Sequence, residues 1–288
     1  MFKKLVRLNW QKIIFVSVVL TVVSRGPVLA EDNPLAQPLT LSETKRISAD
    51  ELKSHAQALQ DLYTQQIESY KLAEKDYQLA KTQQTQLGTL SSVEATTQFA
   101  RTAMIERADV LITYFNLLHD YLVMADGMEP GDKEKTSADI IEHIQAYQTH
   151  RLAVSNIEDR ASLNLAADEF DQLFKVSTSL VYRVLYNLDL SQMNSYRLTA
   201  VDLYQQLQRK QADLPLSPAK LAQRDRAYLD IERVFAQLST QIEFQQQLVA
   251  DENKGGQGIY EQGATLLVET RTDLIRVLGY LQELASVI

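Results

Sequence analysis

The sequence has 288 residues, of which 45% are hydrophobic and 23% charged, and its formal net charge is −8. This composition is that of a folded protein, and the length is sufficient for one large or two small cores. The absence of cysteine excludes disulfides, thiolate metal sites and cysteine nucleophiles. Nine glycines and six prolines are few for this length, which favours long uninterrupted helices over a β-rich fold.

Residues 1–30 have the features of an export signal. Four basic residues precede an apolar run from 13 to 23, and Val28 and Ala30 occupy the −3 and −1 positions of a small-residue cleavage site. An apolar run of 11 residues is shorter than the ~20 residues that span a bilayer comfortably. We predict a signal peptide that is cleaved after Ala30. An uncleaved N-terminal membrane anchor is the alternative, because Arg25 lies close to the cleavage site.

Cleavage at this position would make the protein strongly acidic. It removes five basic residues and no acidic residue, which leaves 24 basic against 37 acidic residues and a formal charge of −13. Such a protein is a poor ligand for nucleic acid and is repelled by anionic lipid.

After a polar tether at residues 31–47, which contains Pro34 and Pro38, the first helix is expected to begin at Ser48. Ser48 and Glu51 have the spacing of a capping box. Apolar and small residues then follow a four-three spacing to Leu87, which is typical of a coiled-coil seam, and Gly88 ends the helix. This seam has more Ala, Tyr and Gln than Leu or Ile.

The second helix, from Ser91 to Ala125, is the stretch around which we expect the fold to be built. Ser91 and Glu94 have the spacing of a capping box, and a broad apolar stripe runs from Met104 to Ala125. Such a stripe must be covered by other segments. Because few residues separate the first two helices, residues 48–125 should form an antiparallel hairpin. We place its turn at 88–91, so that Ala80 faces Ala100.

The remaining helices are expected within residues 137–288. Residues 126–132 are predicted to form a turn. Thr136 or Ser137 is predicted to cap a third helix that ends near Asp159. A fourth helix from about Leu163 should be kinked or broken near 187–191. Ser217 and Pro218 should begin another helix after Pro215, and the glycine-rich stretch 254–258 should be the loop before the last one.

These elements predict an all-α protein: an elongated antiparallel helical bundle of coiled-coil hairpins with six to seven helices, over residues 48–288. No fixed repeat of the solenoid type is evident.

No residues were found that we would assign to catalysis, to cofactor binding or to a metal, and we expect no cofactor. His143 and His150 lie two helical turns apart, ~10 Å, which is too far for one metal ion. We interpret both, and His119, as solvated. The glycines at 255–258 lack the strand and the Lys-Ser/Thr of a phosphate loop.

The run from Phe99 to Leu118, together with the stretches at 70–81 and 180–186, resembles segments of uncharacterised exported all-helical proteins of candidate-phylum bacteria. The likeness covers roughly residues 60–210 and consists of helix-face patterns. It implies a helical fold and export, and it implies no assigned activity and no catalytic residue.

We therefore expect a non-enzymatic, exported helical scaffold or interaction protein, secreted or associated with the cell envelope. A ligand-binding or sensor bundle is the alternative, and it would need an enclosed pocket with convergent polar groups. The outer half of the first helix is poor in large aliphatic residues, so the tip of the hairpin should bury little apolar area and could project from the bundle. We expect a protein partner or a second copy to bind there, no nucleic acid to bind, and a membrane to be contacted only through an uncleaved N-terminus.

Overall fold

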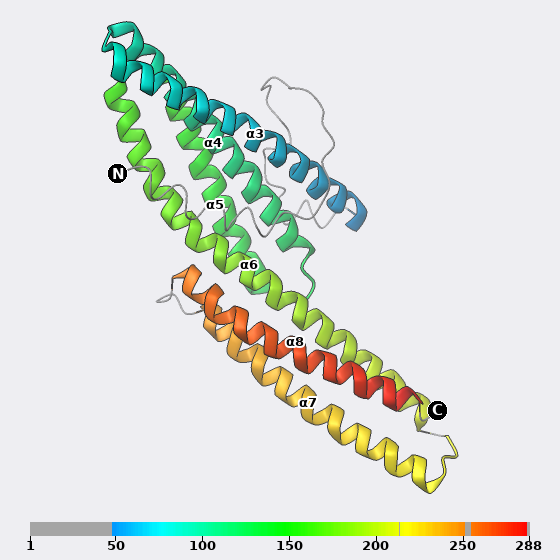
Figure 1. The fold of residues 1–288 in the computed structure, drawn as a ribbon. Helices are drawn as coiled ribbons and strands as arrows, with labels where there is room; N and C mark the ends of the chain where they lie inside the picture. Colours follow the sequence, from blue (N-terminus) through cyan, green and yellow to red (C-terminus); the bar gives the residue numbers. More distant parts are fainter. Residues whose placement is uncertain (1–47, 213, 251–254, 287–288) are drawn as a thin grey trace. The chain divides into compact units, whose positions relative to one another are not determined.

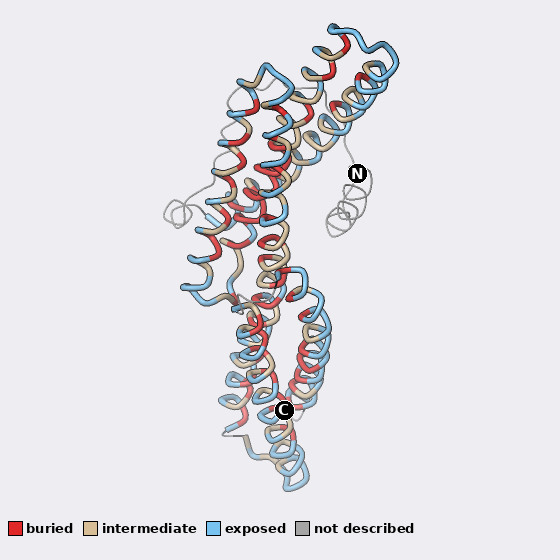
Figure 2. Tube along the Cα trace, turned by 90° about the vertical axis from the view of Figure 1, so that its left-hand side faces the viewer, coloured by how far each residue is buried: buried red, intermediate tan, exposed pale blue. Residues whose placement is uncertain are grey.

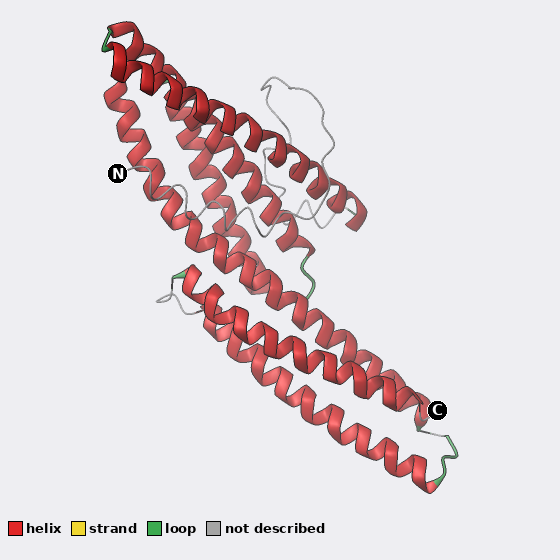
Figure 3. Ribbon diagram, in the orientation of Figure 1, coloured by secondary structure: helices red, strands yellow, loops and turns green. Residues whose placement is uncertain are grey.

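The computed structural model describes residues 48–212, 214–250 and 255–286, and these form six helices without a strand (Figures 1 and 3). The predicted signal segment 1–30 and the tether 31–47 lie outside the described residues. The helices are α3 (Ala49–Leu87), α4 (Leu90–Met124), α5 (Pro130–Ser155), α6 (Arg160–Gln211), α7 (Pro218–Ala250) and α8 (Gly256–Ser286). The packing of these helices is that of a helical bundle, which confirms the predicted fold class.

Several helix ends are where the sequence places them. The Ser48 hydroxyl accepts from the Glu51 backbone N–H at 3.3 Å, and the Glu51 carboxylate accepts from the Ser48 N–H at 2.8 Å, so the capping box is formed. Gly88 has φ +60°, the left-handed conformation that ends a helix at least cost in glycine. Pro218 opens α7, and the hydroxyl of Ser217 accepts from the Lys220 N–H at 3.4 Å.

Two predicted caps are wrong. Ser91 does not cap α4, because the helix begins at Leu90 and Thr89 accepts the Ser92 N–H. Thr136 and Ser137 do not cap the third helix either. Helix α5 already begins at Pro130, whose missing N–H is no loss in the first turn, and Thr136 bonds within the helix to the Asp132 carbonyl.

The predicted break near residues 187–191 is also absent, since α6 is one continuous helix of 52 residues. Asn187 and Ser191 are weak helix breakers, and tertiary contacts fix this part of the helix. The loop before α5 brings Gly127 directly against the Ser191 backbone, and the Asn194 amide donates to the Gly127 carbonyl at 2.7 Å. A side chain at position 127 would prevent this approach.

Helix α4 is surrounded by other helices over three turns. Every residue from Val110 to Asp120 is buried, because α3, α5 and α6 all pack against α4 (Figure 2). The stretch from 91 to 125 is therefore central to the packing of α3, α5 and the first part of α6, whereas α7 and α8 pack on α6 and on each other.

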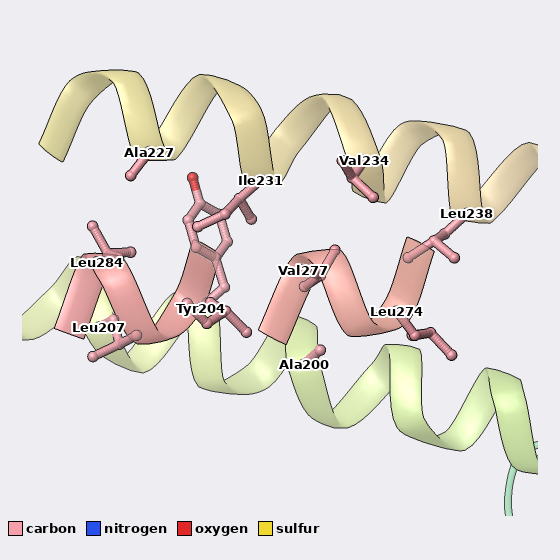
Figure 4. Close-up of a cluster of buried hydrophobic side chains, with 11 residues drawn as sticks. Ala200, Tyr204, Leu207, Ala227, Ile231, Val234, Leu238, Leu274, Val277 and Leu284 are labelled. Carbon is pink, nitrogen blue, oxygen red and sulfur yellow. The ribbon is translucent and has the colours of Figure 1, made fainter. Parts of the chain in front are cut away.

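The second half of α6 packs with α7 and α8. Figure 4 shows apolar side chains from the three helices pointing toward one another. They are Ala200, Tyr204 and Leu207 of α6, Ala227, Ile231, Val234 and Leu238 of α7, and Leu274, Val277, Leu281 and Leu284 of α8. Helix α6 therefore belongs to two sets of contacts, one with α4 and α5 and one with α7 and α8.

Candidate interaction surface at the hairpin tip

Helices α3 and α4 form an antiparallel hairpin, and we call residues 77–100 its tip. The tip begins where the loop between α5 and α6 meets α4: the Arg101 guanidinium donates to the Ile157 carbonyl at 3.1 Å. Within the tip, the buried residues are Ala80, Ser92 and Thr96. None of these has a large apolar side chain, so the tip buries little apolar area, as its sequence indicated.

Small residues let the two backbones of the tip approach closely. The Thr96 hydroxyl donates to the Ala80 carbonyl at 3.1 Å, and it also bonds to the Ser92 carbonyl within its own helix. This contact corrects the predicted register, because Ala80 lies opposite Thr96 and not opposite Ala100. The connection consists of Gly88 and Thr89 alone, shorter than the turn we expected, and so the facing positions move toward the turn.

The surface of the tip is apolar at four positions. Leu79, Leu87, Leu90 and Phe99 are all exposed, and Leu90, at 74%, is the most exposed large hydrophobic residue of the described chain. Leu87 ends α3 and Leu90 begins α4, so these two leucines flank the turn at the end of the hairpin.

The tip also lacks charge around its turn. No Asp, Glu, Lys or Arg occurs from Thr82 to Val93, although such residues make up 23% of the sequence. Lys81, whose ammonium lies 5.6 Å from the centre of the Tyr77 ring, and Glu94 mark the two ends of this run. The polar side chains between them are amides and hydroxyls.

The histidines lie differently from our expectation that they are solvated. His119 is fully buried, and its Nε2 lies 2.8 Å from the Ser137 hydroxyl on α5. Burial lowers the pKa of His119 to about 4, so the ring is neutral at pH 7. His150 is also buried, and burial lowers its pKa, whereas His143 is only partly exposed. The α4 sequence could not reveal this, since the side chains that cover His119 come from other helices.

Two further polar contacts, both partly buried, attach α3 and α5 to α4. The His55 Nδ1 lies 2.6 Å from an Asp120 carboxylate oxygen, and the Arg151 Nε donates to Asp109 at 2.6 Å. Burial raises the pKa of the Asp109 and Asp120 carboxyl groups, while their basic partners act in the opposite direction. These contacts hold α3 and α5 against α4, which is a structural role.

Aromatic side chains add further contacts between α3, α4, α5 and α6. Tyr147 of α5 stacks on Phe115 of α4 at 5.9 Å and donates its hydroxyl to Ser177 of α6 at 3.0 Å. The Arg107 guanidinium lies 4.0 Å from the centre of the Phe170 ring, a cation–π contact between α4 and α6. Burial raises the pKa of Tyr63, whose ring packs on Tyr114, to about 12.

The glycine-rich stretch that we took for an interhelical loop is partly helical. Gly256 is the first residue of α8, and its N–H donates to the Ser179 hydroxyl of α6 at 2.8 Å. A Cβ at position 256 would collide with the Ser179 backbone, so glycine is required here for close helix packing and not for holding a phosphate.

Within the described residues, no group of three or more His, Asp and Glu side chains is placed to hold a metal ion. Nor does any described helix contain an apolar stretch of the length and hydropathy needed to cross a membrane. Comparisons with protein-family models, with curated proteins and with solved structures found no significant match to this chain. The resemblance to exported helical proteins of candidate-phylum bacteria therefore stays a prediction.

Proposed function

We propose that this protein is a non-enzymatic, exported interaction protein of the cell envelope, and that the hairpin tip is its contact site. The observation that carries the proposal is the exposure of Leu87 and Leu90 on either side of the turn between α3 and α4, with Leu79 and Phe99 also exposed farther along the two helices. Leu87 and Leu90 are separated only by the two-residue turn, and exposed apolar residues that lie close together on a protein surface mark sites of contact with other molecules.

The middle of α4 and its contacts with α3 and α5 can hold the tip in a fixed position. The middle of α4 is buried on all sides, and its polar groups are used in contacts between helices, as in the pairs His55–Asp120 and His119–Ser137. Such contacts fix the relative positions of α3, α4 and α5 and so give the tip a rigid base.

Export is supported by the sequence of residues 1–30, with its basic start, apolar run and small-residue cleavage site. We propose that the protein is secreted or held at the cell envelope. Its acidic character makes nucleic acid an unsuitable partner.

The proposal is tested by comparing two triple variants of the full chain in cell fractions. In the tip variant, Leu79, Leu87 and Leu90 are replaced by Gln. In the control, Leu152, Leu229 and Leu278 are replaced by Gln, since these leucines are 55–65% exposed on other helices. Circular dichroism and melting temperature should show that both variants fold.

We expect the tip variant to move from the envelope fraction to the soluble fraction and the control to remain with the envelope. Equal retention of both variants would refute the proposal that the tip is the contact site.

A further inference from the structure

We propose that the hairpin tip inserts Leu87 and Leu90 into the surface of an electrically neutral lipid bilayer. This inference rests on the proposed function, in which the tip is the contact site, and it specifies what the tip contacts. It departs from our expectation from the sequence that a protein binds the tip and that a membrane is contacted only through an uncleaved N-terminus.

The position of the two leucines suits insertion. Leu87 and Leu90 are 65% and 74% exposed, and they are separated only by the left-handed Gly88 and by Thr89. Both therefore lie at the very end of the hairpin, where a flat surface can reach them before it meets any other part of the two helices.

The distribution of charge sets how deeply the tip can enter. At 1.5 Å per residue, the uncharged residues 82–87 extend over about 9 Å of α3 and residues 90–93 over about 6 Å of α4. These lengths are of the same order as the 5–10 Å to which the apolar face of a helix lying in the membrane plane enters the boundary between headgroups and acyl chains. Lys81 and Glu94 would then lie at the aqueous side, so no charge is moved out of water.

The polar groups of the tip are compatible with this environment. The hydroxyls of Thr82 and Thr85 donate to the Gln78 and Lys81 carbonyls, and the Ser92 hydroxyl donates to the Thr89 carbonyl. These groups enter the interface already hydrogen-bonded. The exposed amides of Gln83 and Gln86 are neutral donors and acceptors for lipid headgroups.

A bilayer suits this end of the hairpin better than a protein. A stable protein–protein interface needs about 800 Å² from each partner, and two leucines with a two-residue turn provide only a fraction of that area. Shallow insertion has no such requirement. The net charge, −8 for the full sequence and −13 after cleavage at Ala30, repels anionic lipid, so the favoured surface is a zwitterionic one.

The test uses a fluorescent label at the tip of the full chain. Because the sequence has no cysteine, Gln86→Cys gives a single site for an environment-sensitive dye, and Gln247→Cys on α7 gives a matched exposed control. Each labelled protein is titrated with phosphatidylcholine vesicles, and with vesicles that also contain phosphatidylglycerol. A label at the tip reports insertion there and not binding through residues 1–30.

We expect the dye at position 86 to shift to shorter wavelength and brighten several-fold with phosphatidylcholine, and the dye at position 247 to stay unchanged. Leu87→Gln and Leu90→Gln should each weaken the response about tenfold, and phosphatidylglycerol should weaken it as well. An unchanged dye at position 86, or a response insensitive to both substitutions, would overturn the inference.

The two proposals fail in different ways. If vesicles do not bind the tip but the triple tip variant still leaves the envelope fraction, the tip binds a protein or a second copy, and only the lipid inference is lost. If the tip variant stays in the envelope fraction although its intact mass shows cleavage after Ala30, the proposed function itself is wrong.

Discussion

Gly263 of α8 lies so close to the ring of Tyr186 on α6 that a Cβ on Gly263 would overlap the ring. The Tyr186 hydroxyl donates to Gln245 of α7 at 2.9 Å, and the Gln245 amide donates to Thr270 of α8 at 2.8 Å. Tyr186 thus connects the three helices by packing and hydrogen bonding together. This arrangement depends on glycine at position 263.

We expect Gly263→Ala to lower the free energy of unfolding by about 1–3 kcal/mol, because the added methyl group must displace a fully buried ring. Gly279→Ala on the same helix is the control, since a Cβ there meets no atom within 4 Å. It should stabilise the protein by about 0.5–1 kcal/mol, as alanine does in a helix interior. Urea denaturation measures both changes, and a stabilising Gly263→Ala would contradict the packing described.

The register of the hairpin is tested by paired cysteines. Oxidation should cross-link Ala80→Cys with Thr96→Cys within one chain faster than Ala80→Cys with Ala100→Cys, because the Thr96 hydroxyl reaches the Ala80 carbonyl. Gel mobility after oxidation separates cross-linked from open chains. A faster reaction of the Ala80–Ala100 pair would restore the register expected from the sequence.

Leu118 lies in the fully enclosed part of α4 and is 3% exposed. Leu118→Asp would bury a charge without a partner, and we expect it to unfold the protein or to cost more than about 3 kcal/mol. Leu278→Asp, at an exposed position of α8, should change the stability by no more than about 0.5 kcal/mol. Similar melting temperatures for the two variants would show that α4 is not enclosed.

We expect the protein to lose stability in mild acid because His119 is buried in its neutral form. Its pKa is lowered to about 4 in the folded protein, against 6.5 for an unperturbed histidine. As the pH falls from 6.5 to 4, the unfolded chain binds a proton at this site and the folded chain does not, so the free energy of unfolding falls, by about 3 kcal/mol for this group. The raised pKa values of Asp109 and Asp120 act in the opposite sense.

Comparison with His119→Asn separates the histidine from these carboxyl groups, which both proteins share. Urea denaturation at pH 7.5 and 4.5 should show a larger loss for the wild-type chain than for the variant. Equal losses would mean that His119 is accessible to protons in the folded state.

If the protein is exported through a cleaved signal peptide, its N-terminus should differ from Met1. A signal peptide cleaved after Ala30 leaves Glu31 as the first residue, and the intact mass of protein exported from a suitable host measures this directly. Uncleaved chain in the membrane fraction would favour the N-terminal anchor instead.

Local signals in the sequence predicted three helix ends correctly and two wrongly, since Thr89 caps α4 in place of Ser91 and α5 begins at Pro130, before Thr136 and Ser137. Ser48 with Glu51, Gly88, and Ser217 with Pro218 each set a helix end by their own chemistry, and all three are found. The all-helical class followed in the same way from long apolar periodicities and few breakers.

Predictions failed where packing between distant segments decides the outcome. The loop before α5 packs Gly127 against α6 at Ser191, and His119 is buried against Ser137 of α5, neither of which a local pattern can show. The exposed leucines of the tip were missed for a similar reason. A helix face with few Leu and Ile residues indicates that little apolar area is buried. It does not identify which side chains are exposed.

The length of α6 also sets an order of events during synthesis. Its first half meets α4 and α5, which precede it in the chain, whereas Ala200, Tyr204 and Leu207 in its second half pack on α7 and α8, which follow it. A nascent chain that ends near residue 212 can assemble the first set of contacts and still present an uncovered apolar face. Until α8 is complete, that face is available to chaperones, and a chain truncated before α7 would be prone to aggregation.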